Sequence, residues 1–253
     1  MTSTIDVDVR TEDGIADACL IRPDGPGPYP GVLFFMDAFG LRPRIVEMAS
    51  RIADRGYVVL VPNLFYRAGR TPVLDASDLT DADARGKAFQ TAMPLIKALN
   101  ATTTGRDAGA YLNFLDAQDG VAAGPDAAVG YCMGGRNALL TAAAYPDRVA
   151  AVGSFHAGGL VGDQPDSPHL RLGAITGEVH LAHADNDGSM NADHIRTVEA
   201  ALDEAGVTYT SEVYEGAPHG FTMADTAMYH QAAEQRHWTA LFGLLDRAVP
   251  TGR

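Results

Sequence analysis

Short runs of apolar residues alternate with amphipathic segments along most of the chain. A strand buried on both faces of a parallel sheet is a nearly continuous apolar run, whereas an amphipathic helix repeats its apolar positions every three to four residues. Gly31 to Met36 is a continuous apolar run, and the segment from Pro43 to Gly56 has helical spacing. The alternation predicts an α/β fold, with a mostly parallel central sheet and helices on both faces.

Two further strands are expected before this alternation begins. Ile5, Val7 and Val9 alternate with polar residues, and a more uniformly apolar run, 15–21, follows a turn-like segment. We interpret both as antiparallel edge strands. The other predicted strands are 57–61, 127–131, 149–155, 178–184 and 208–214. The other predicted helices are 84–100, with a break or kink at Pro94, 106–118, 137–145, 193–205 and 228–248.

The organisation of the chain indicates a single domain. Neither an internal repeat nor a break in composition divides the 253 residues. One α/β domain often fills this length, so we expect residues 1–253 to form a single α/β domain. The polar, turn-rich stretch 66–83 is expected to act as a flap over a site.

Composition and charge exclude several classes of protein. Hydrophobic residues make up 46% of the chain, enough for a sizeable core, yet no apolar run is long enough for a membrane span. The net charge of −13 repels phosphate backbones, so we expect no nucleic-acid partner. Because the first residues lack a basic and then apolar export signal, we expect a cytoplasmic protein. Two cysteines cannot form a disulfide framework.

The segment Gly130-Tyr-Cys-Met-Gly-Gly135 is the strongest chemical motif. It lies between an apolar strand and a helical pattern, which is the context of a nucleophile elbow. Gly130 and Gly134, two residues before and after Cys132, provide the small side chains that such a sharp turn needs. The alternative is that Cys132 is a small buried hydrophobe, as we interpret Cys19. The glycines favour Cys132 as a nucleophile.

A cysteine nucleophile needs a base, and later loops offer one. In α/β-hydrolases the chain order is nucleophile, acid and histidine. His219 lies in a rigid Pro-His-Gly loop after the last strand, and Asp187 follows the strand before it. Asp185 is the alternative acid, but Asp187 lies deeper in the loop. The remaining histidines of strand and helix patterns are expected to be structural: His180, His183, His194, His230 and His237. With no second cluster of ligands, we expect no metal.

These residues resemble the dienelactone hydrolase family of α/β-hydrolases, and the resemblance covers most of the chain. It includes the cysteine elbow, the Phe39-Gly40 pair and the loops of Asp187 and His219. The resemblance implies a catalytic triad of Cys132, His219 and Asp187.

The resemblance also implies two other parts of the site. In the family a glutamate before the Phe-Gly pair contacts the resting thiol, and Asp37 occupies that position here. The backbone N–H groups of Ala38 and Met133 would form the oxyanion hole, which donates hydrogen bonds to the tetrahedral intermediate.

Substrate recognition is less specified by the motifs. Family enzymes bind the lactone carboxylate with arginines, and Arg67, Arg70 and Arg85 lie in the corresponding region, with Arg85 as our candidate. His156 replaces an aromatic residue that is more common in the family, so we expect it to line the pocket.

The sequence therefore predicts hydrolysis of a small-molecule ester or lactone through an acyl-enzyme, without a cofactor. Three alternatives stay open: a broader carboxylesterase or thioesterase, a non-catalytic binding module on the same scaffold, and a thiol redox sensor. A reactive Cys132 should be alkylated at a lower pH than an ordinary thiol, whereas an inert buried one should barely react.

Overall fold

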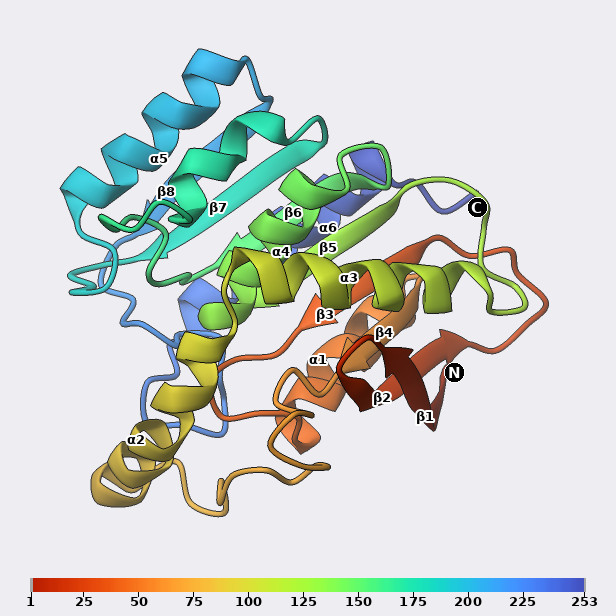
Figure 1. Cartoon of the computed structure of the whole chain (residues 1–253), viewed down its shortest axis with the longest axis horizontal. Coiled ribbons are helices and arrows are strands. Elements are labelled where there is room, and N and C mark those ends of the chain that lie inside the picture. Colours follow the sequence, from red (N-terminus) through yellow and green to blue (C-terminus); the bar gives the residue numbers. More distant parts are fainter. Residues whose placement is uncertain (1, 253) are drawn as a thin grey trace.

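Residues 2–252 are described by the structure, a computed structural model, and they form one eight-stranded sheet (Figure 1). The strand order across the sheet is β1-β2-β4-β3-β5-β6-β7-β8. The strands are β1 Thr2–Thr11, β2 Gly14–Pro23, β3 Gly31–Phe35, β4 Val58–Pro62, β5 Asp126–Tyr131, β6 Val149–Phe155, β7 Glu178–Ala184 and β8 Tyr209–Tyr214. From β4 to β8 all neighbours are parallel, which confirms the predicted fold class.

The first two strands are antiparallel, as the alternation predicted, but only one is an edge. β1 pairs with β2, and β2 pairs on its other side with β4. The prediction of two edge strands was therefore wrong for β2. β2 is almost continuously buried from Ala16 to Ile21, because an interior strand is covered on both faces and paired on both sides.

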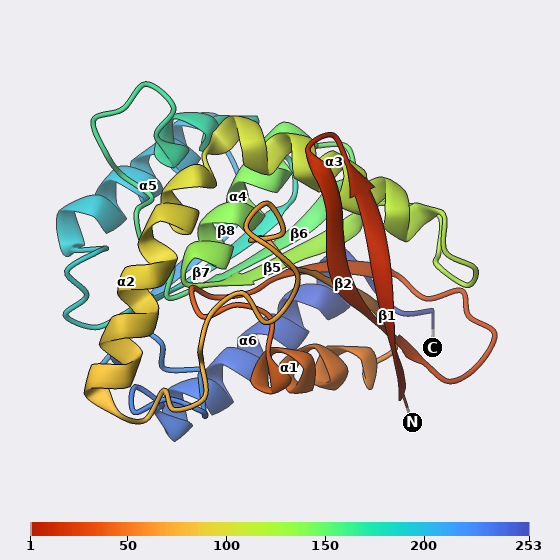
Figure 2. The ribbon, with the colours of Figure 1, turned by 60° about the horizontal axis from the view of Figure 1, so that its bottom comes forward.

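Helices cover both faces of the sheet. Figure 2 shows α1 and α6 beneath it, and α3, α4 and α5 above it. α2 lies at one end of the molecule, beyond the carboxyl ends of the central strands (Figures 1 and 2). The helices are α1 Pro43–Ala53, α2 Ala82–Ala98, α3 Ala101–Asp116, α4 Met133–Ala144, the 3-10 helix η1 Pro168–Ala174, α5 Ala192–Ala205 and α6 Gln231–Ala248.

Several helix boundaries differ from the predicted ones. A break or kink was expected at Pro94, and α2 continues through that residue without a break. α3 begins five residues earlier than predicted, because Asn100 and Thr103 form a reciprocal capping box that the apolar periodicity does not reveal. The 3-10 helix η1 was not predicted at all.

The other two differences concern residues near the candidate site. α4 begins directly after Cys132, four residues before the predicted start. α6 begins at Gln231, because the imidazole of His230 accepts a hydrogen bond from the N–H of Ala233 and caps the helix. The prediction that His230 lies within the helix was therefore wrong, because His230 precedes the first helical residue.

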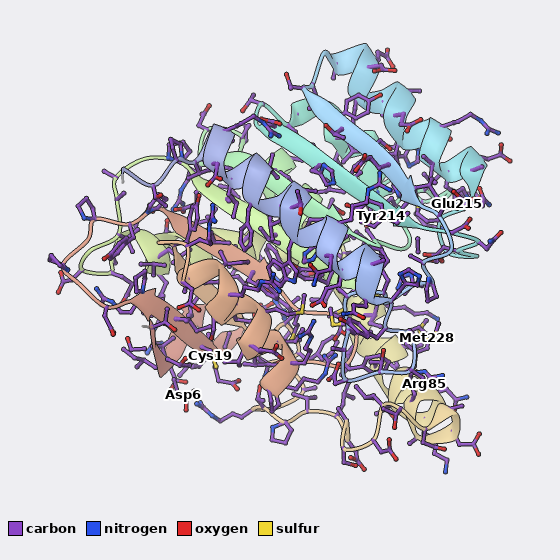
Figure 3. The ribbon with its side chains drawn as sticks, turned by 180° about the vertical axis from the view of Figure 1, so that it is seen from behind. Asp6, Cys19, Arg85, Tyr214, Glu215 and Met228 are labelled. Atoms are coloured by element: carbon purple, nitrogen blue, oxygen red, sulfur yellow. The ribbon has the colours of Figure 1, made fainter. Side chains whose placement is uncertain are left out.

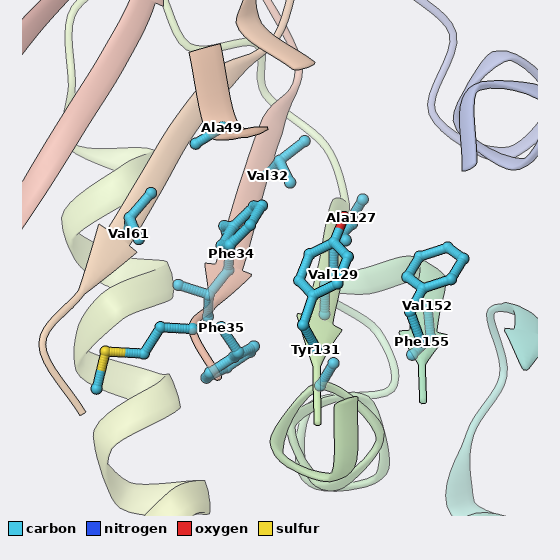
Figure 4. Packing of buried hydrophobic residues seen from close by; sticks show 14 of the residues in the cluster. Val32, Phe34, Phe35, Ala49, Val61, Ala127, Val129, Tyr131, Val152 and Phe155 are labelled. Atoms are coloured by element: carbon cyan, nitrogen blue, oxygen red, sulfur yellow. The ribbon is translucent and has the colours of Figure 1, made fainter. Parts of the chain in front are cut away.

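A row of aromatic rings crosses the central strands below the elbow. The ring centroids of Phe34 and Tyr131 are 5.0 Å apart, and those of Tyr131 and Phe155 are 5.4 Å apart (Figure 4). All three side chains are buried, and the Tyr131 hydroxyl is 2.8 Å from Nε2 of His237. Because Tyr131 directly precedes Cys132, this packing holds the end of β5 in place.

The core is continuous along the chain. Its cluster of buried apolar residues extends from Val9 in β1 to Val249 after α6. The expectation that residues 1–253 form one domain stays a prediction, and residues 1 and 253 lie outside the described part. None of the helices in the described part is long and apolar enough to cross a membrane.

Candidate active site

Cys132 occupies a sharp turn between β5 and α4. Its φ of 56° and ψ of −122° are unusual for a residue with a side chain, and strain of this kind is common at catalytic turns. A Cβ at Gly130 would clash with the carbonyl oxygen of Gly134, and one at Gly134 would clash with the carbonyl oxygens at the end of β3. The steric requirement inferred from the sequence is present at both glycines.

Three side chains from separate loops meet at this turn. The Nε2 atom of His219 is 3.1 Å from the Sγ atom of Cys132. On the other side of the ring, Nδ1 of His219 is 2.6 Å from Oδ2 of Asp187. The parallel strands β5, β7 and β8 end at the same edge of the sheet, and this edge brings the three loops together.

The electrostatics of this row favour an imidazolium. Burial disfavours a charge on His219, but the Cys132 thiolate and the Asp187 carboxylate outweigh it and raise the pKa of His219 to about 10. Burial likewise opposes the charge on Asp187, but hydrogen bonds from His219 and Ser189 lower its pKa to about 2. The arrangement can hold a thiolate beside a protonated imidazole.

Of the two candidate acids, Asp187 is the one that contacts His219. The other oxygen of Asp187 accepts hydrogen bonds from the N–H and the hydroxyl of Ser189, at 2.8 and 2.7 Å. Asp185 instead accepts a hydrogen bond from the N–H of Gly216 at 2.9 Å, which links the two loops.

A largely apolar pocket of about 340 Å³ opens onto Cys132. Four positions on one face of α2, spaced as a helix requires, form one wall, and the loop after His219 forms another. The residues that line the pocket are Asp37, Ala38, Phe39, Ala82, Arg85, Gly86, Phe89, Cys132, His156, His219, Gly220, Met223, Thr226 and Met228. No group of three or more His, Cys, Asp or Glu side chains within residues 2–252 is arranged to hold a metal ion.

Of the three candidate arginines, only Arg85 lines this pocket. One of its terminal nitrogens donates to the carbonyl oxygens of Leu79 and Thr80, at 3.0 and 3.4 Å. Arg67 is held by carboxylates outside the pocket, and Arg70 by Asp8. Of the predicted flap, 66–83, Ala82 is the residue that lines this pocket within the described part. Residues 70–77 line a different hollow, and the first turns of α2 form the pocket wall instead.

His156 is completely buried at the pocket wall. Its Nε2 atom is 2.8 Å from the hydroxyl oxygen of Thr222, and its ring centroid is 5.3 Å from that of His219. Burial and the neighbouring His219 hold the pKa of His156 well below its ordinary value, so the ring is neutral. A neutral imidazole can shape the pocket without adding charge to it.

Asp37 lines the same pocket as Cys132, but its carboxylate is held by an arginine that the motifs did not reveal. Arg42 donates to both oxygens of Asp37, at 2.6 and 3.0 Å, and also pairs with Asp225. The predicted role of Asp37 as the acid that modulates the thiol stays a prediction. Only the spacing of Asp37 and Arg42 along the chain could have hinted at their pairing.

Of the two residues expected to supply the oxyanion hole, Met133 directly follows Cys132 in the chain, and Ala38 lines the same pocket. Met133 is the first residue of α4, so its N–H has no acceptor within the helix. Ala38 follows Asp37 in the loop after β3, and it lines the pocket together with Cys132. The function of both groups in stabilising an oxyanion stays a prediction.

The other cysteine lies in a different environment. Cys19 is buried in the hairpin of β1 and β2, beside Asp6 and away from Arg85 and Met228 (Figure 3). Burial and the Asp6 carboxylate raise the pKa of Cys19 to about 11, so this thiol is inert at neutral pH. It borders a larger hollow of about 1170 Å³ that does not contain Cys132.

Several known proteins are similar to this chain in sequence. Residues 16–249 match the model of the dienelactone hydrolase family. A carboxymethylenebutenolidase from Rhodococcus opacus is 27% identical over 227 residues, which cover 87% of this chain and 82% of the relative.

Solved structures show the same similarity. A dienelactone hydrolase-like promiscuous phosphotriesterase from metagenomic libraries aligns over 98% of both chains, with a TM-score of 0.76 and 25% identity. A dienelactone hydrolase from Anabaena variabilis, at 18% identity, shares the fold with a TM-score of 0.63 over 95% of this chain and 98% of its own.

Proposed function

The chain belongs to the dienelactone hydrolase family, and from this premise we propose that it hydrolyses small esters or lactones through a covalent acyl-cysteine. It is a hydrolase acting on esters. The hydrogen-bonded row of Cys132, His219 and Asp187 carries the proposed mechanism, because it joins a thiol, a base and an orienting carboxylate.

In the first half-reaction, the Cys132 thiolate attacks the carbonyl carbon. The carbonyl oxygen takes the negative charge, and the N–H groups of Ala38 and Met133 donate hydrogen bonds to it. As the tetrahedral intermediate collapses, the bond to the leaving oxygen breaks, and that oxygen takes the proton from His219. In a lactone the leaving hydroxyl stays attached to the acyl group.

In the second half-reaction, neutral His219 removes a proton from water. The resulting hydroxide attacks the thioester carbonyl, and the carbon–sulfur bond breaks. The acid product leaves, and the thiolate–imidazolium pair is restored. Asp187 keeps the His219 ring oriented and offsets its charge in both steps.

The substrate is proposed to enter the apolar pocket with its acyl part against Phe39, Phe89 and Met228. Arg85 is proposed to bind a carboxylate of the substrate, because it is the arginine that borders this pocket within the described residues and His219 is engaged with Cys132 and Asp187. His156 is proposed to contact the bound substrate as an uncharged wall of the pocket.

The test is hydrolysis of a panel containing a dienelactone, simple activated esters and thioesters by the native protein, Cys132→Ala and Cys19→Ala. Native activity should disappear in Cys132→Ala and persist in Cys19→Ala, whose thiol is buried elsewhere. Mass spectrometry of the quenched reaction should find the acyl group on the peptide of Cys132.

Each other outcome has a definite meaning. Activity on simple esters alone would retain the triad and remove the lactone from the proposal. Undiminished hydrolysis by Cys132→Ala would overturn the mechanism. No turnover of any panel member, with Cys132 unreactive toward iodoacetamide, would favour a binding module.

A further inference from the structure

Arg42 joins two loops that both border the pocket of Cys132. Its side chain is buried, and its guanidinium forms paired hydrogen bonds with two carboxylates. Asp37 accepts at 2.6 and 3.0 Å, and Asp225 accepts at 2.6 and 3.1 Å. A further hydrogen bond of 3.2 Å goes to the carbonyl oxygen of Gly40.

The first of these loops carries one of the proposed oxyanion donors. Asp37 accepts a hydrogen bond from the N–H of Phe39 at 3.0 Å, and its carbonyl oxygen accepts one from Gly40 at 3.2 Å. Arg42 thus closes a short ring of interactions around Ala38. The direction of the Ala38 N–H depends on this ring, since the loop has no partner strand there.

The second loop carries the catalytic base of the proposed mechanism. Asp225 lies six residues after His219, within a series of turns whose residues Met223, Thr226 and Met228 line the pocket. Arg42 also approaches the sulfur of Met223, at 3.6 Å. The backbone of Arg42 is itself anchored, because its carbonyl oxygen accepts the first hydrogen bonds of α1.

We propose that Arg42 is a positioning residue that joins the oxyanion loop, residues 37–40, to the histidine loop, residues 219–228. It also neutralises Asp37 in the pocket that Cys132 lines. The proposal rests on the proposed function, because it assigns Arg42 to the same reaction. It also changes the expected role of Asp37, whose negative charge is bound by Arg42 and is not directed to the thiol.

The reason is electrostatic as well as geometric. A carboxylate that lost its arginine in this apolar pocket would disfavour both a thiolate and an oxyanion nearby. Asp225 is less sensitive, because a third of its side chain is exposed and water can solvate it. Arg42 is suited to this position, because Asp37 and Asp225 outweigh its burial and raise its pKa above the ordinary value.

The experiment compares Arg42→Met with the double variant Arg42→Met/Asp37→Asn. Arg42→Met should lower kcat/KM about tenfold or more and shift the iodoacetamide alkylation profile of Cys132 to higher pH. The double variant also removes the unpaired negative charge of Asp37, so it should shift the alkylation profile back and restore most of kcat/KM. A merely structural arginine would give no such rescue.

Arg67→Met is the matched control. Arg67 also bridges two carboxylates, those of Asp13 and Asp107, but it lies outside the pocket. Its variant should unfold at a lower temperature and keep the alkylation profile of the native protein. Arg42→Lys is the second variant, for use if Arg42→Met does not fold. Lysine keeps the positive charge but cannot form the paired hydrogen bonds of a guanidinium. We therefore expect kcat to fall severalfold while the alkylation profile of Cys132 stays unchanged.

Two results would overturn the proposal. One is an alkylation profile of Arg42→Met identical to that of the native protein, and the other is a double variant no more active than Arg42→Met. A native kcat in Arg42→Lys would remove the positioning role. Failure of the native protein to hydrolyse any ester would count against the proposed function, whereas the alkylation profiles would still report on Arg42.

Discussion

The Nδ1 atom of His219 lies 2.6 Å from the Oδ2 atom of Asp187, across two loops that follow the neighbouring parallel strands β7 and β8. This contact orients the ring so that its Nε2 atom faces Cys132. It also supplies part of the charge that favours a protonated His219. The pH dependence of the reaction should therefore respond to Asp187.

Asp187→Asn should lower kcat by about a hundredfold or more, since the ring loses its orientation and its counter-charge. The native pKa of His219, about 10, places loss of the imidazolium near that pH, so the alkaline limb of kcat/KM should lie there. In the variant this limb should move to lower pH.

Profiles of kcat/KM between pH 5 and 11 test this prediction. Asp185→Asn is the control, because Asp185 contacts Gly216 and not His219. An unmoved limb would contradict the prediction.

Asp126→Asn should make folding stability less dependent on pH. Burial raises the pKa of Asp126 from 3.8 to about 7, so between these values the folded state binds a proton that the unfolded state releases. Stability from this group is present at low pH and decreases as the pH rises to about 7.

At pH 8 the variant should therefore gain up to about 4 kcal/mol relative to its effect at pH 4. Urea unfolding at both pH values measures the difference, with the exposed Asp163→Asn as the control. An equal effect of Asp126→Asn at both pH values would refute a raised pKa.

Gly134→Ala should damage both stability and activity. The added Cβ would clash with the carbonyl oxygens of Phe35 and Met36, so the elbow and the start of the oxyanion loop would have to move apart. We expect a loss of about 1–3 kcal/mol in the free energy of unfolding and a kcat lower by about a hundredfold. Gly105→Ala is the control. Gly105 lies in α3, and a Cβ there would be 3.6 Å from the Cβ of Ala144, an ordinary van der Waals distance. Native kcat in Gly134→Ala would show that the close approach is dispensable.

Arg85→Gln should weaken binding of anionic substrates only. The guanidinium borders the pocket, so an ester with a carboxylate should show a KM about tenfold higher in the variant, whereas a neutral ester of similar size should not. Arg70→Gln is the matched control, because Arg70 is exposed and paired with Asp8 outside this pocket. Equal changes for both esters would mean that Arg85 supports the wall and does not recognise charge.

Local signals in the sequence were sufficient for much of the architecture. The apolar runs of β3 to β7 and the helical spacing of α1 predicted parallel strands and covering helices, because burial imposes these periods on every such element. Helix ends were harder to predict from the sequence, since caps such as that of Asn100 depend on single side chains. At Pro94 a break or kink was expected, and the helix continues there without a break, because a local preference is only a weak guide to helix ends.

For the site, the chain by itself determined the elbow. Gly130, Cys132 and Gly134 lie close together in sequence, so their steric relationship is local and visible as a motif. The tertiary structure alone decided that Asp187 and not Asp185 reaches His219, and that Arg42 binds both Asp37 and Asp225. Arg42 and Asp225 are 183 positions apart, and such a contact arises only when parallel strands bring their carboxyl ends to one edge of the sheet. No sequence period encodes it.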